Sequence, residues 1–214
     1  MGQIGNDDLN TFIDKQIVWF GQSAFRITSG LSETLYIDPY KISGDPVSAD
    51  CVLITHPHHD HYNPKVISRI RKSDTAVIVP QSMSSQCMQG IRPGEKIKIK
   101  SFAIEAVPAY NCRNFPHAPK NGWLGYIVEV DNVRIFHAGD SDFIPPMSTF
   151  EVDIAMLPVV GFATMNISSA VRAAHAMKAK VVIPMHYSLM PWTKQHGQKF
   201  ARVFNGTTIV MKPY

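Results

Sequence analysis

The sequence predicts a mixed α/β (α+β) domain in which two β-sheets pack face to face, with helices on their outer surfaces. Two observations support this fold class. Short apolar runs rich in β-branched and aromatic residues recur along the chain, and only a few helical patterns lie between them. The 214 residues, 45% of them hydrophobic, contain no solenoid repeat and no low-complexity linker, which indicates one domain over residues 1–214.

The predicted strands are short apolar runs that end at turn-forming residues. They cover residues 16–20, 24–28, 35–37, 52–55, 76–79, 97–99, 102–108, 125–130, 133–137, 154–158, 181–185 and 208–212. Asp131-Asn132 is a two-residue hairpin signal, because both residue types tolerate the left-handed backbone that such turns need. Gly21-Gln22-Ser23 predicts another tight connection.

Apolar residues spaced three and four apart predict helices over residues 64–71, 82–89, 166–179 and 193–203. The clearest of these begins at Asn166, a favoured N-cap residue, and carries an apolar stripe from Ile167 to Met177. The helices follow strands, which places them outside the sheets.

The composition narrows the class of protein. A formal charge of +4 with no basic stripe between aromatic residues argues against nucleic acid as a partner. The three cysteines, an odd number without a Cys-x-x-Cys pair, predict no disulfide framework and a reducing, cytoplasmic location. The chain shows no secretory signal and no apolar run long enough to cross a membrane. We expect the partner to be a small-molecule substrate, and the sequence leaves open whether the protein forms a homo-oligomer.

Residues 56–61 form the most informative segment, His-Pro-His-His-Asp-His, directly after an apolar run. Neutral imidazoles and a carboxylate suit a borderline divalent metal such as zinc. Neighbouring residues on a helix do not share a face, so this density predicts a loop at a strand end whose side chains converge. Its position inside the chain, after a strand that looks buried, argues against a solvated surface loop.

Three further residues stand at the ends of predicted strands. Asp38 follows residues 35–37, Asp140 follows the strand 133–137, and His186 follows the strand 181–185. Taken alone, each of them has an ordinary explanation, as an aspartate in a turn or as a core histidine hydrogen-bonded to the backbone. Together with His56-x-His58-x-Asp60-His61 they form a specific pattern, because loops that leave strand ends meet at one rim of a sheet sandwich.

With these motifs the chain resembles the metallo-β-lactamase-fold hydrolases, and most of all the compact group that includes ascorbate-phosphate lactonases and related metal-dependent hydrolases. The match runs from Trp19-Phe20-Gly21 to Ile183-Pro184-Met185-His186. The resemblance implies a four-layer αββα sandwich with metal ions in a cleft along its upper edge. The length leaves no room for the added nuclease cap domain of some relatives.

The resemblance also implies roles for individual residues. One metal ion would be bound by His56, His58 and a third imidazole, and the second by Asp60, His61 and His186, with Asp140 bridging the two. A water between the metal ions would be the nucleophile, and Asp60 would be the catalytic residue that orients it or takes its proton. Asp38 would support the histidine loop from the second shell without binding metal. His59 has no place in this pattern.

Two positions depart from the family pattern. The third motif usually has a histidine directly after the strand that here ends in Ala109-Tyr110, where this chain has Asn111. We expect His117 to be the missing ligand; the alternative is that Asn111 or a water takes its place. The second departure is Gln22, where relatives often have histidine. Gln22 and Asn111 are candidate substrate-binding residues, and glutamine excludes a proton shuttle near neutral pH.

The expected function is that of a dinuclear metal-dependent hydrolase. A metal-activated water would cleave an ester, lactone or phosphodiester bond in a small anionic substrate. Zinc is the favoured cofactor, with manganese or iron as alternatives, because histidine and carboxylate ligands suit all three. Two other functions stay open: a phosphodiesterase or nuclease acting on nucleic acid, and a non-catalytic metal-binding module with the same fold, which Asn111 and Gln22 keep open.

Overall fold

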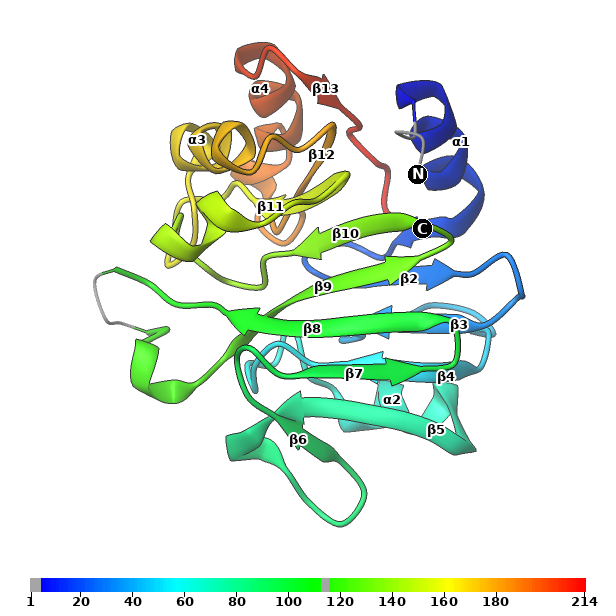
Figure 1. Cartoon of the computed structure of the whole chain (residues 1–214). Coiled ribbons are helices and arrows are strands. Elements are labelled where there is room, and N and C mark those ends of the chain that lie inside the picture. The colour runs from blue at the N-terminus through cyan, green and yellow to red at the C-terminus, as the bar shows by residue number, and fades with distance from the viewer. Residues whose placement is uncertain (1–4, 113–115) are drawn as a thin grey trace.

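The computed structural model describes residues 5–112 and 116–214 of the chain. Residues 1–4 and 113–115 lie outside this description. The expectation about a secretory signal falls partly on residues 1–4 and is therefore outside the described residues. In the described part, two sheets stack face to face, and helices lie on their outer sides (Figure 1). The αββα sandwich expected from the sequence is therefore confirmed.

The first sheet has six strands in chain order. They are β1 (Ile17–Trp19), β2 (Phe25–Thr28), β3 (Thr34–Ile37), β4 (Ala49–Leu53), β5 (Arg71–Pro80) and β6 (Gln89–Ile91). The first three pair antiparallel, and β3 to β6 pair parallel. Because β3 and β4 are parallel neighbours, their carboxyl ends meet at one edge of the sheet.

The second sheet has seven strands in the order β13-β12-β11-β10-β9-β8-β7. They are β7 (Lys96–Ile99), β8 (Phe102–Pro108), β9 (Leu124–Val130), β10 (Val133–His137), β11 (Ile154–Pro158), β12 (Val181–Met185) and β13 (Thr207–Thr208). β10 to β13 are parallel. β8 points the same way as β10, because both pair antiparallel with β9. The ends of β8, β10 and β12 therefore share one edge as well.

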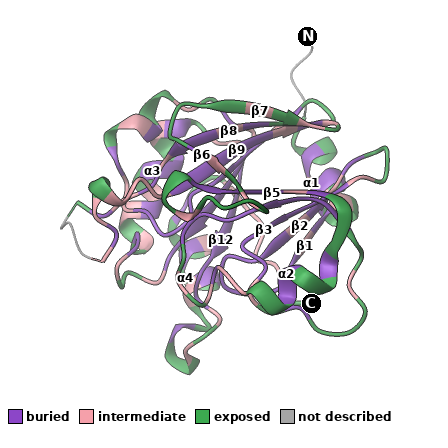
Figure 2. Cartoon of the chain, turned by 90° about the horizontal axis from the view of Figure 1, so that it is seen from below, coloured by how far each residue is buried: buried purple, intermediate pink, exposed green. Residues whose placement is uncertain are grey.

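Alternating side chains of the strands supply the cores on both faces of the first sheet. Leu35 and Ile37 of β3 point into the main core between the sheets, while Tyr36 joins a second cluster under helix α2 (Pro64–Ile70). On the outside of the second sheet, α3 (Ile167–Met177) contacts β11, and α4 (His196–Val203) contacts β12. Figure 2 shows the central strands buried, while β7 and the first residues of β5 are largely exposed. Four short 3-10 turns complete the described elements: η1 (Gln81–Met83), η2 (Pro119–Asn121), η3 (Pro145–Thr149) and η4 (Pro191–Thr193).

The hairpin at Asp131-Asn132 is confirmed. Both residues have a left-handed backbone, with φ of 49° and 64°, and they join β9 to β10. The Gly21-Gln22-Ser23 connection is also a tight turn, closed by the N–H of Ala24 donating to the carbonyl of Gly21. It joins β1 to β2 at the edge where the parallel strands end.

Two expectations for elements are wrong, and one helix was not expected. Residues 82–89 do not form a helix: η1 is followed by an exposed turn, because the serine side chains at 84 and 85 bind neighbouring groups locally and only Met83 and Met88 are partly buried. The last strand is confined to β13, so most of residues 208–212 lies outside it. Helix α1 (Asn6–Gln16) was missed in the sequence, because only Leu9, Phe12 and Ile13 form its buried stripe among polar neighbours.

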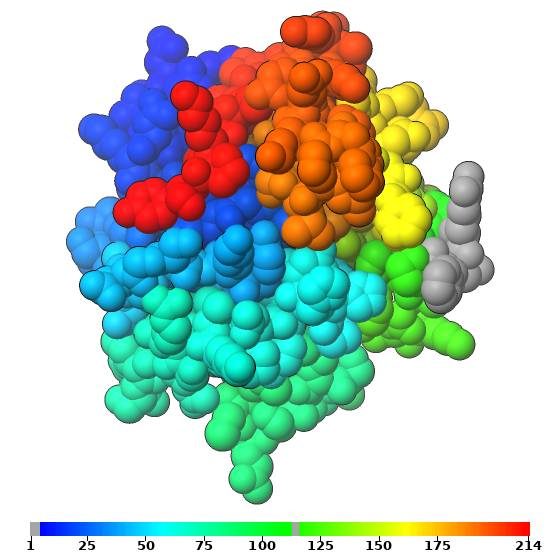
Figure 3. Space-filling view, turned by 180° about the vertical axis from the view of Figure 1, so that it is seen from behind, coloured from blue at the N-terminus to red at the C-terminus, as the bar shows by residue number. Residues whose placement is uncertain are grey.

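The end of the chain returns to the first sheet. The backbone N–H of Tyr214 donates to the carbonyl of Trp19, and the C-terminal segment runs across the rear face toward the N-terminal part (Figure 3). All three cysteines are free, with Cys51 buried in the main core as expected. Within residues 5–112 and 116–214, no helix combines the length and the apolar character needed to cross a bilayer.

Candidate metal centre

The strand ends gather histidines and aspartates at one edge of the sandwich. From the first sheet, Asp38 follows β3 and the loop of residues 56–61 follows β4. From the second sheet, His117 lies in the segment after β8, Asp140 follows β10, and His186 follows β12. This is the convergence that the sequence predicts, and it depends on the parallel pairing of β3 with β4 and of β10 with β12 through β11.

Asp38 supports the histidine loop from below. It is fully buried and has a left-handed backbone with φ of 49°. One carboxylate oxygen accepts the N–H of Thr55 at 2.8 Å, and the other accepts the Thr55 hydroxyl at 2.7 Å and lies 2.6 Å from Nδ1 of His61. Because a carboxylate only accepts, Nδ1 of His61 carries a proton. Its Nε2 faces the site and offers a lone pair to a metal ion once that nitrogen is unprotonated.

Three sets of side chains place ligand atoms within 4.8 Å of one another among the described residues. Their members are His56, His58 and His117; His56, His61 and Asp140; and Asp60, His61 and His186. Asp140 joins the sets: its Oδ2 lies 3.9 Å from His56 and 3.7 Å from His117, while its Oδ1 lies 3.2 Å from His61 and 3.1 Å from His186. This geometry suits a carboxylate that bridges two metal ions.

The buried polar atoms fit divalent metal ions. Nε2 of His117 is buried and has no hydrogen-bond partner among the described residues. Nε2 of His56 lies 3.0 Å from Nδ1 of His58. Uncharged imidazoles that turn nitrogen atoms toward one point are stable when a cation takes their lone pairs. The donor set of imidazoles and carboxylates without thiolate suits zinc, manganese and iron.

The first set of ligands is electrically neutral. Burial lowers the pKa of His56 well below its usual value, and burial also lowers the pKa values of His58 and His117. All three side chains therefore present unprotonated nitrogen near pH 7. Metal binding requires this form of the imidazole.

The second set holds protons when no metal is bound. Burial disfavours charge on His61 and His186, but the carboxylates beside them outweigh burial together and raise both pKa values, that of His186 to about 9. These carboxylates are Asp140 and Asp38 at His61, and Asp140 and Asp60 at His186. Burial also opposes ionisation of Asp60 and Asp140, yet His186 beside them lowers both pKa values. The carboxylates are therefore ionised at neutral pH, and a metal ion displaces protons from the two imidazoles.

His117 is brought to the place where the family pattern needs an imidazole. Its Nδ1 lies 2.8 Å from Oδ1 of Asn111 and 3.0 Å from the carbonyl of Ala163. Both of these atoms accept, since the Asn111 nitrogen donates to Ala163 at 2.8 Å. Nδ1 of His117 is therefore protonated, and its Nε2 faces His56 and Asp140.

Asn111 thus orients the imidazole from behind. Both polar atoms of its side chain are engaged within the protein, and its backbone N–H also donates to the carbonyl of His117. The candidate role of Asn111 in binding substrate receives no support from this arrangement. Trp123, which the sequence suggested for an apolar wall of the cleft or for the core, packs its ring on His56, His58 and His117 at 4.9–5.3 Å.

Gln22 secures the loop that carries His186. Its side-chain oxygen accepts the backbone N–H groups of Ser188 at 3.0 Å and Leu189 at 2.9 Å. Its own carbonyl accepts the N–H of His186 at 3.0 Å, where the backbone of His186 is left-handed with φ of 60°. Because backbone N–H groups only donate, the oxygen of the amide must face them, and its nitrogen must point the other way.

The remaining histidines stand apart from the ligand sets. His137 is fully buried on β10, and its Nε2 lies 2.9 Å from the carbonyl of Ser23, which gives it a structural, hydrogen-bonded place. His59 is exposed, His175 is exposed on α3, and His196 is half-buried with its Nδ1 3.1 Å from the carbonyl of Val159.

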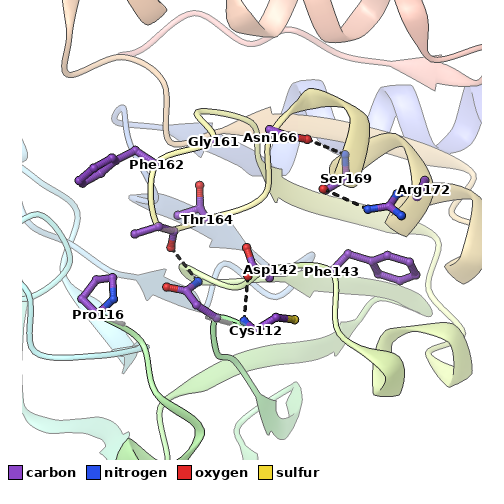
Figure 4. A pocket seen from close by; sticks show the side chains of 12 residues that line it. Cys112, Pro116, Asp142, Phe143, Gly161, Phe162, Thr164, Asn166, Ser169 and Arg172 are labelled. Atoms are coloured by element: carbon purple, nitrogen blue, oxygen red, sulfur yellow. Dashed lines mark hydrogen bonds between the residues drawn. The ribbon is translucent and has the colours of Figure 1, made fainter. Parts of the chain in front are cut away.

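A cleft of about 260 Å³ opens above the ligands. Asp60, Asp140 and His186 contribute to its floor, and Gln22 reaches its side. A larger cavity of about 590 Å³ adjoins it and shares Pro116, Phe162 and Ala163 with it (Figure 4). The ligand floor is thus accessible to a molecule that enters from outside.

Two stacked sheets with histidines and aspartates at one edge define the class of metallo-β-lactamase-fold proteins. Residues 16–186 match the model of the beta-lactamase superfamily domain, and the chain belongs to this superfamily. It is 30% identical to a "UPF0173 metal-dependent hydrolase" of Archaeoglobus fulgidus over 92% of this chain and 96% of the relative.

Solved structures agree with this assignment. A putative metal-dependent hydrolase of Parabacteroides distasonis superposes with a TM-score of 0.77 at 28% identity, over 92% of this chain and 93% of that one. CmlA of Streptomyces venezuelae, a diiron β-hydroxylase, has a TM-score of 0.72 at 15% identity, over 98% of this chain and 56% of CmlA, which is a likeness of fold alone. The expectation of a metal-dependent hydrolase with this fold is confirmed.

Proposed function

We propose that the cleft binds two divalent metal ions and that the protein uses them to hydrolyse an ester, lactone or phosphodiester bond in a small molecule. The observation that carries this proposal is the position of Asp140, whose two oxygens face two different sets of imidazoles at 3.1–3.9 Å. A carboxylate in this position holds two ions close together. When bound, two ions supply an activated water at neutral pH and stabilise the negative charge that develops in the transition state.

The ligands divide between the two ions as follows. His56, His58 and His117 hold the first, and Asp60, His61 and His186 hold the second. Zinc is the favoured metal, with manganese and iron as alternatives, because the donor set without thiolate accepts all three. Supply and coordination geometry decide among them.

Asp60 is the proposed catalytic residue. It lies in the floor of the cleft, and its side chain keeps 15% of its exposure, whereas Asp140 keeps 7%. Its pKa is lowered by His186 against the effect of burial, so it is ionised at neutral pH. An ionised carboxylate at this place accepts a hydrogen bond from the attacking water and receives its proton.

Gln22 is the proposed hydrogen-bond donor to the substrate. Its oxygen is fixed by Ser188 and Leu189, so its N–H2 group points away from them, and the residue lines the cleft. The amide nitrogen has no partner among the described residues. It therefore offers a donor that stays uncharged at all pH values, directed to an oxygen of the substrate.

A small molecule is the proposed partner. A volume of about 260 Å³ is near the lower end of the range of small-molecule sites, and the lining residues that the structure describes include no lysine and no arginine. The proposal of an anionic substrate therefore depends on the charge of the metal ions.

The test combines a metal assay with a substrate panel. The protein is purified without chelators, its metal content is measured, and it is assayed against esters, lactones and phosphodiesters. We expect two metal ions per chain, hydrolysis of at least one class, and loss of at least about 100-fold in rate in Asp60→Asn. Asp74→Asn, which changes a carboxylate 62% exposed on the surface, is the matched control. A metal-loaded protein that hydrolyses no member of the panel would contradict the proposal.

A further inference from the structure

The mouth of the cleft carries large apolar side chains in exposed positions. Phe162 is 76% exposed and Leu189 is 53% exposed, and both line the cleft together with Met190 and Val160. They stand on different segments: Phe162 follows β11, and Leu189 follows β12. An apolar rim above a polar floor is typical of sites that take small ligands.

The segment of Phe162 is fixed to the metal centre. The carbonyl of the next residue, Ala163, accepts from the amide of Asn111 and from Nδ1 of His117, one of the proposed ligands. Gly161 and Ala163 on either side have left-handed backbones, with φ of 82° and 55°. The turn therefore holds Phe162 outward at a defined place beside the cleft.

The segment of Leu189 is fixed in the same manner. Its backbone N–H donates to the side-chain oxygen of Gln22 at 2.9 Å, next to the N–H of Ser188 at 3.0 Å. Gln22 in turn accepts the backbone N–H of His186. Two exposed apolar side chains are thus tied by hydrogen bonds to the residues that hold the proposed ligands, although exposure to water is unfavourable for both.

The charges of the residues around the cleft agree with its apolar rim. Among the described residues, the cleft lining includes no lysine and no arginine, so no basic side chain described there would pair with an anionic tail. Arg172 lines the adjoining cavity, but Asp142 lines it as well. Figure 4 shows Phe162 and Arg172 at opposite ends of that cavity.

We propose that the substrate carries an uncharged apolar group beside its scissile bond and that Phe162, Leu189 and Met190 hold this group. The inference rests on the proposed function, since it places the reacting bond over the metal ions. A water molecule occupies about 30 Å³, so 260 Å³ has room for about eight groups of that size, the reacting group included. A short-chain ester or lactone fits this volume.

Hydroxamic acids test the inference by binding, independently of turnover. Their head group chelates metal ions, and the tail is varied while the head stays the same. The probes are acetohydroxamate, butanohydroxamate, 4-methylpentanohydroxamate and the monohydroxamate of succinate. The last two have tails of nearly equal shape, but a carboxylate replaces two methyl groups and their branch carbon. Dissociation constants are measured by calorimetry on the metal-loaded protein.

We expect affinity to rise about fourfold for each added methylene, which corresponds to about 0.8 kcal/mol. The 4-methylpentanoyl probe is expected to bind at least about tenfold more tightly than the succinyl probe. Phe162→Ala and Leu189→Ala should remove most of the gain from chain length and leave acetohydroxamate unchanged. Leu31→Ala, which truncates another exposed apolar side chain at 75% exposure, is the control and should change nothing.

Two results would contradict the inference but leave the proposed function standing, and a third would contradict both. If all tails bind equally, the apolar rim does not hold the substrate, while the metal site stands. If the succinyl probe binds most tightly and Arg172→Ala abolishes this preference, the tail is anionic and the adjoining cavity holds it. If metal-loaded protein binds no hydroxamate, acetohydroxamate included, the proposed function fails together with the inference.

Discussion

Replacement of Asp38 by asparagine tests how the fold prepares one of the two metal sites. The change keeps the size of the side chain, and the asparagine oxygen still accepts the N–H of Thr55. An N–H2 group, however, takes the place of the oxygen that lies 2.6 Å from Nδ1 of His61. Two donors cannot share that contact, so the proton of His61 moves from Nδ1 to Nε2. The atom that faces Asp60, Asp140 and His186 then carries a proton and offers no lone pair.

The expected magnitude follows from the burial of this pair. Asp38 and His61 are both fully buried, so no water replaces the lost contact. Outer contacts that orient a metal-binding histidine are typically worth 10–100-fold in metal affinity, which is about 1.4–2.7 kcal/mol. Only the ion held by Asp60, His61 and His186 should weaken, because His56, His58 and His117 bind the other.

Competition with a chromophoric chelator measures this effect on purified metal-free protein. Asp38→Asn should show one site of wild-type affinity and one site weakened by 10–100-fold. Thr55→Ser, which keeps the hydroxyl that bonds to Asp38, is the control and should leave both sites unchanged. If Asp38→Asn binds both ions as the wild type does, Asp38 does not set the protonation of His61, and the reasoning is refuted.

Three other outcomes follow from the same contacts. His117→Ala should lower the metal content from two ions per chain toward one by elemental analysis; an unchanged content would remove His117 from the ligands. Gly139→Ala should lower the free energy of unfolding in urea by about 1–3 kcal/mol, because φ is 56° there and the new Cβ would lie 2.8 Å from the carbonyl of Leu124. Gly30→Ala, where the Cβ meets no atom closer than 3.5 Å, should cost less, and equal losses would contradict the argument. Burial lowers the pKa of His186, but the carboxylates beside it outweigh burial and raise it to about 9, so metal binding should release protons at pH 7 and weaken as the pH falls. Calorimetry in two buffers of different ionisation enthalpy measures this release, and a buffer-independent heat would argue against it.

The ligands other than His117 were predictable because they follow apolar runs. His56 to His61 follow β4, and His186 follows β12, so the period-2 and turn signals of the sequence place them at strand ends. The meeting of the two sheets at that edge depends on strand order. The sequence alone does not specify that order, and the family resemblance supplied it.

The details that sequence reasoning missed depend on contacts between distant segments. The orientation of His117 requires the carbonyl of Ala163, 46 residues further along the chain. The role of Gln22 requires the backbone of Ser188, 166 residues away. Helix α1 was missed because only three of its residues are buried, and they pack against core residues that lie far away in the sequence. The segment at 82–89 was expected to be a helix from the spacing of its apolar residues. In the structure only Met83 and Met88 pack, partly buried, against the cluster under α2, which is too little for a buried stripe.

The position of metal in crystals of the metal-loaded protein tests the central claim most directly. Anomalous difference maps, recorded above and below the absorption edge of the bound metal, locate each ion and identify its element. The account predicts two peaks, one among His56, His58 and His117 and one among Asp60, His61 and His186, with Asp140 between them. A single ion with all coordination positions filled by protein would indicate a structural site and contradict the account. Peaks that lie away from these side chains would contradict it as well.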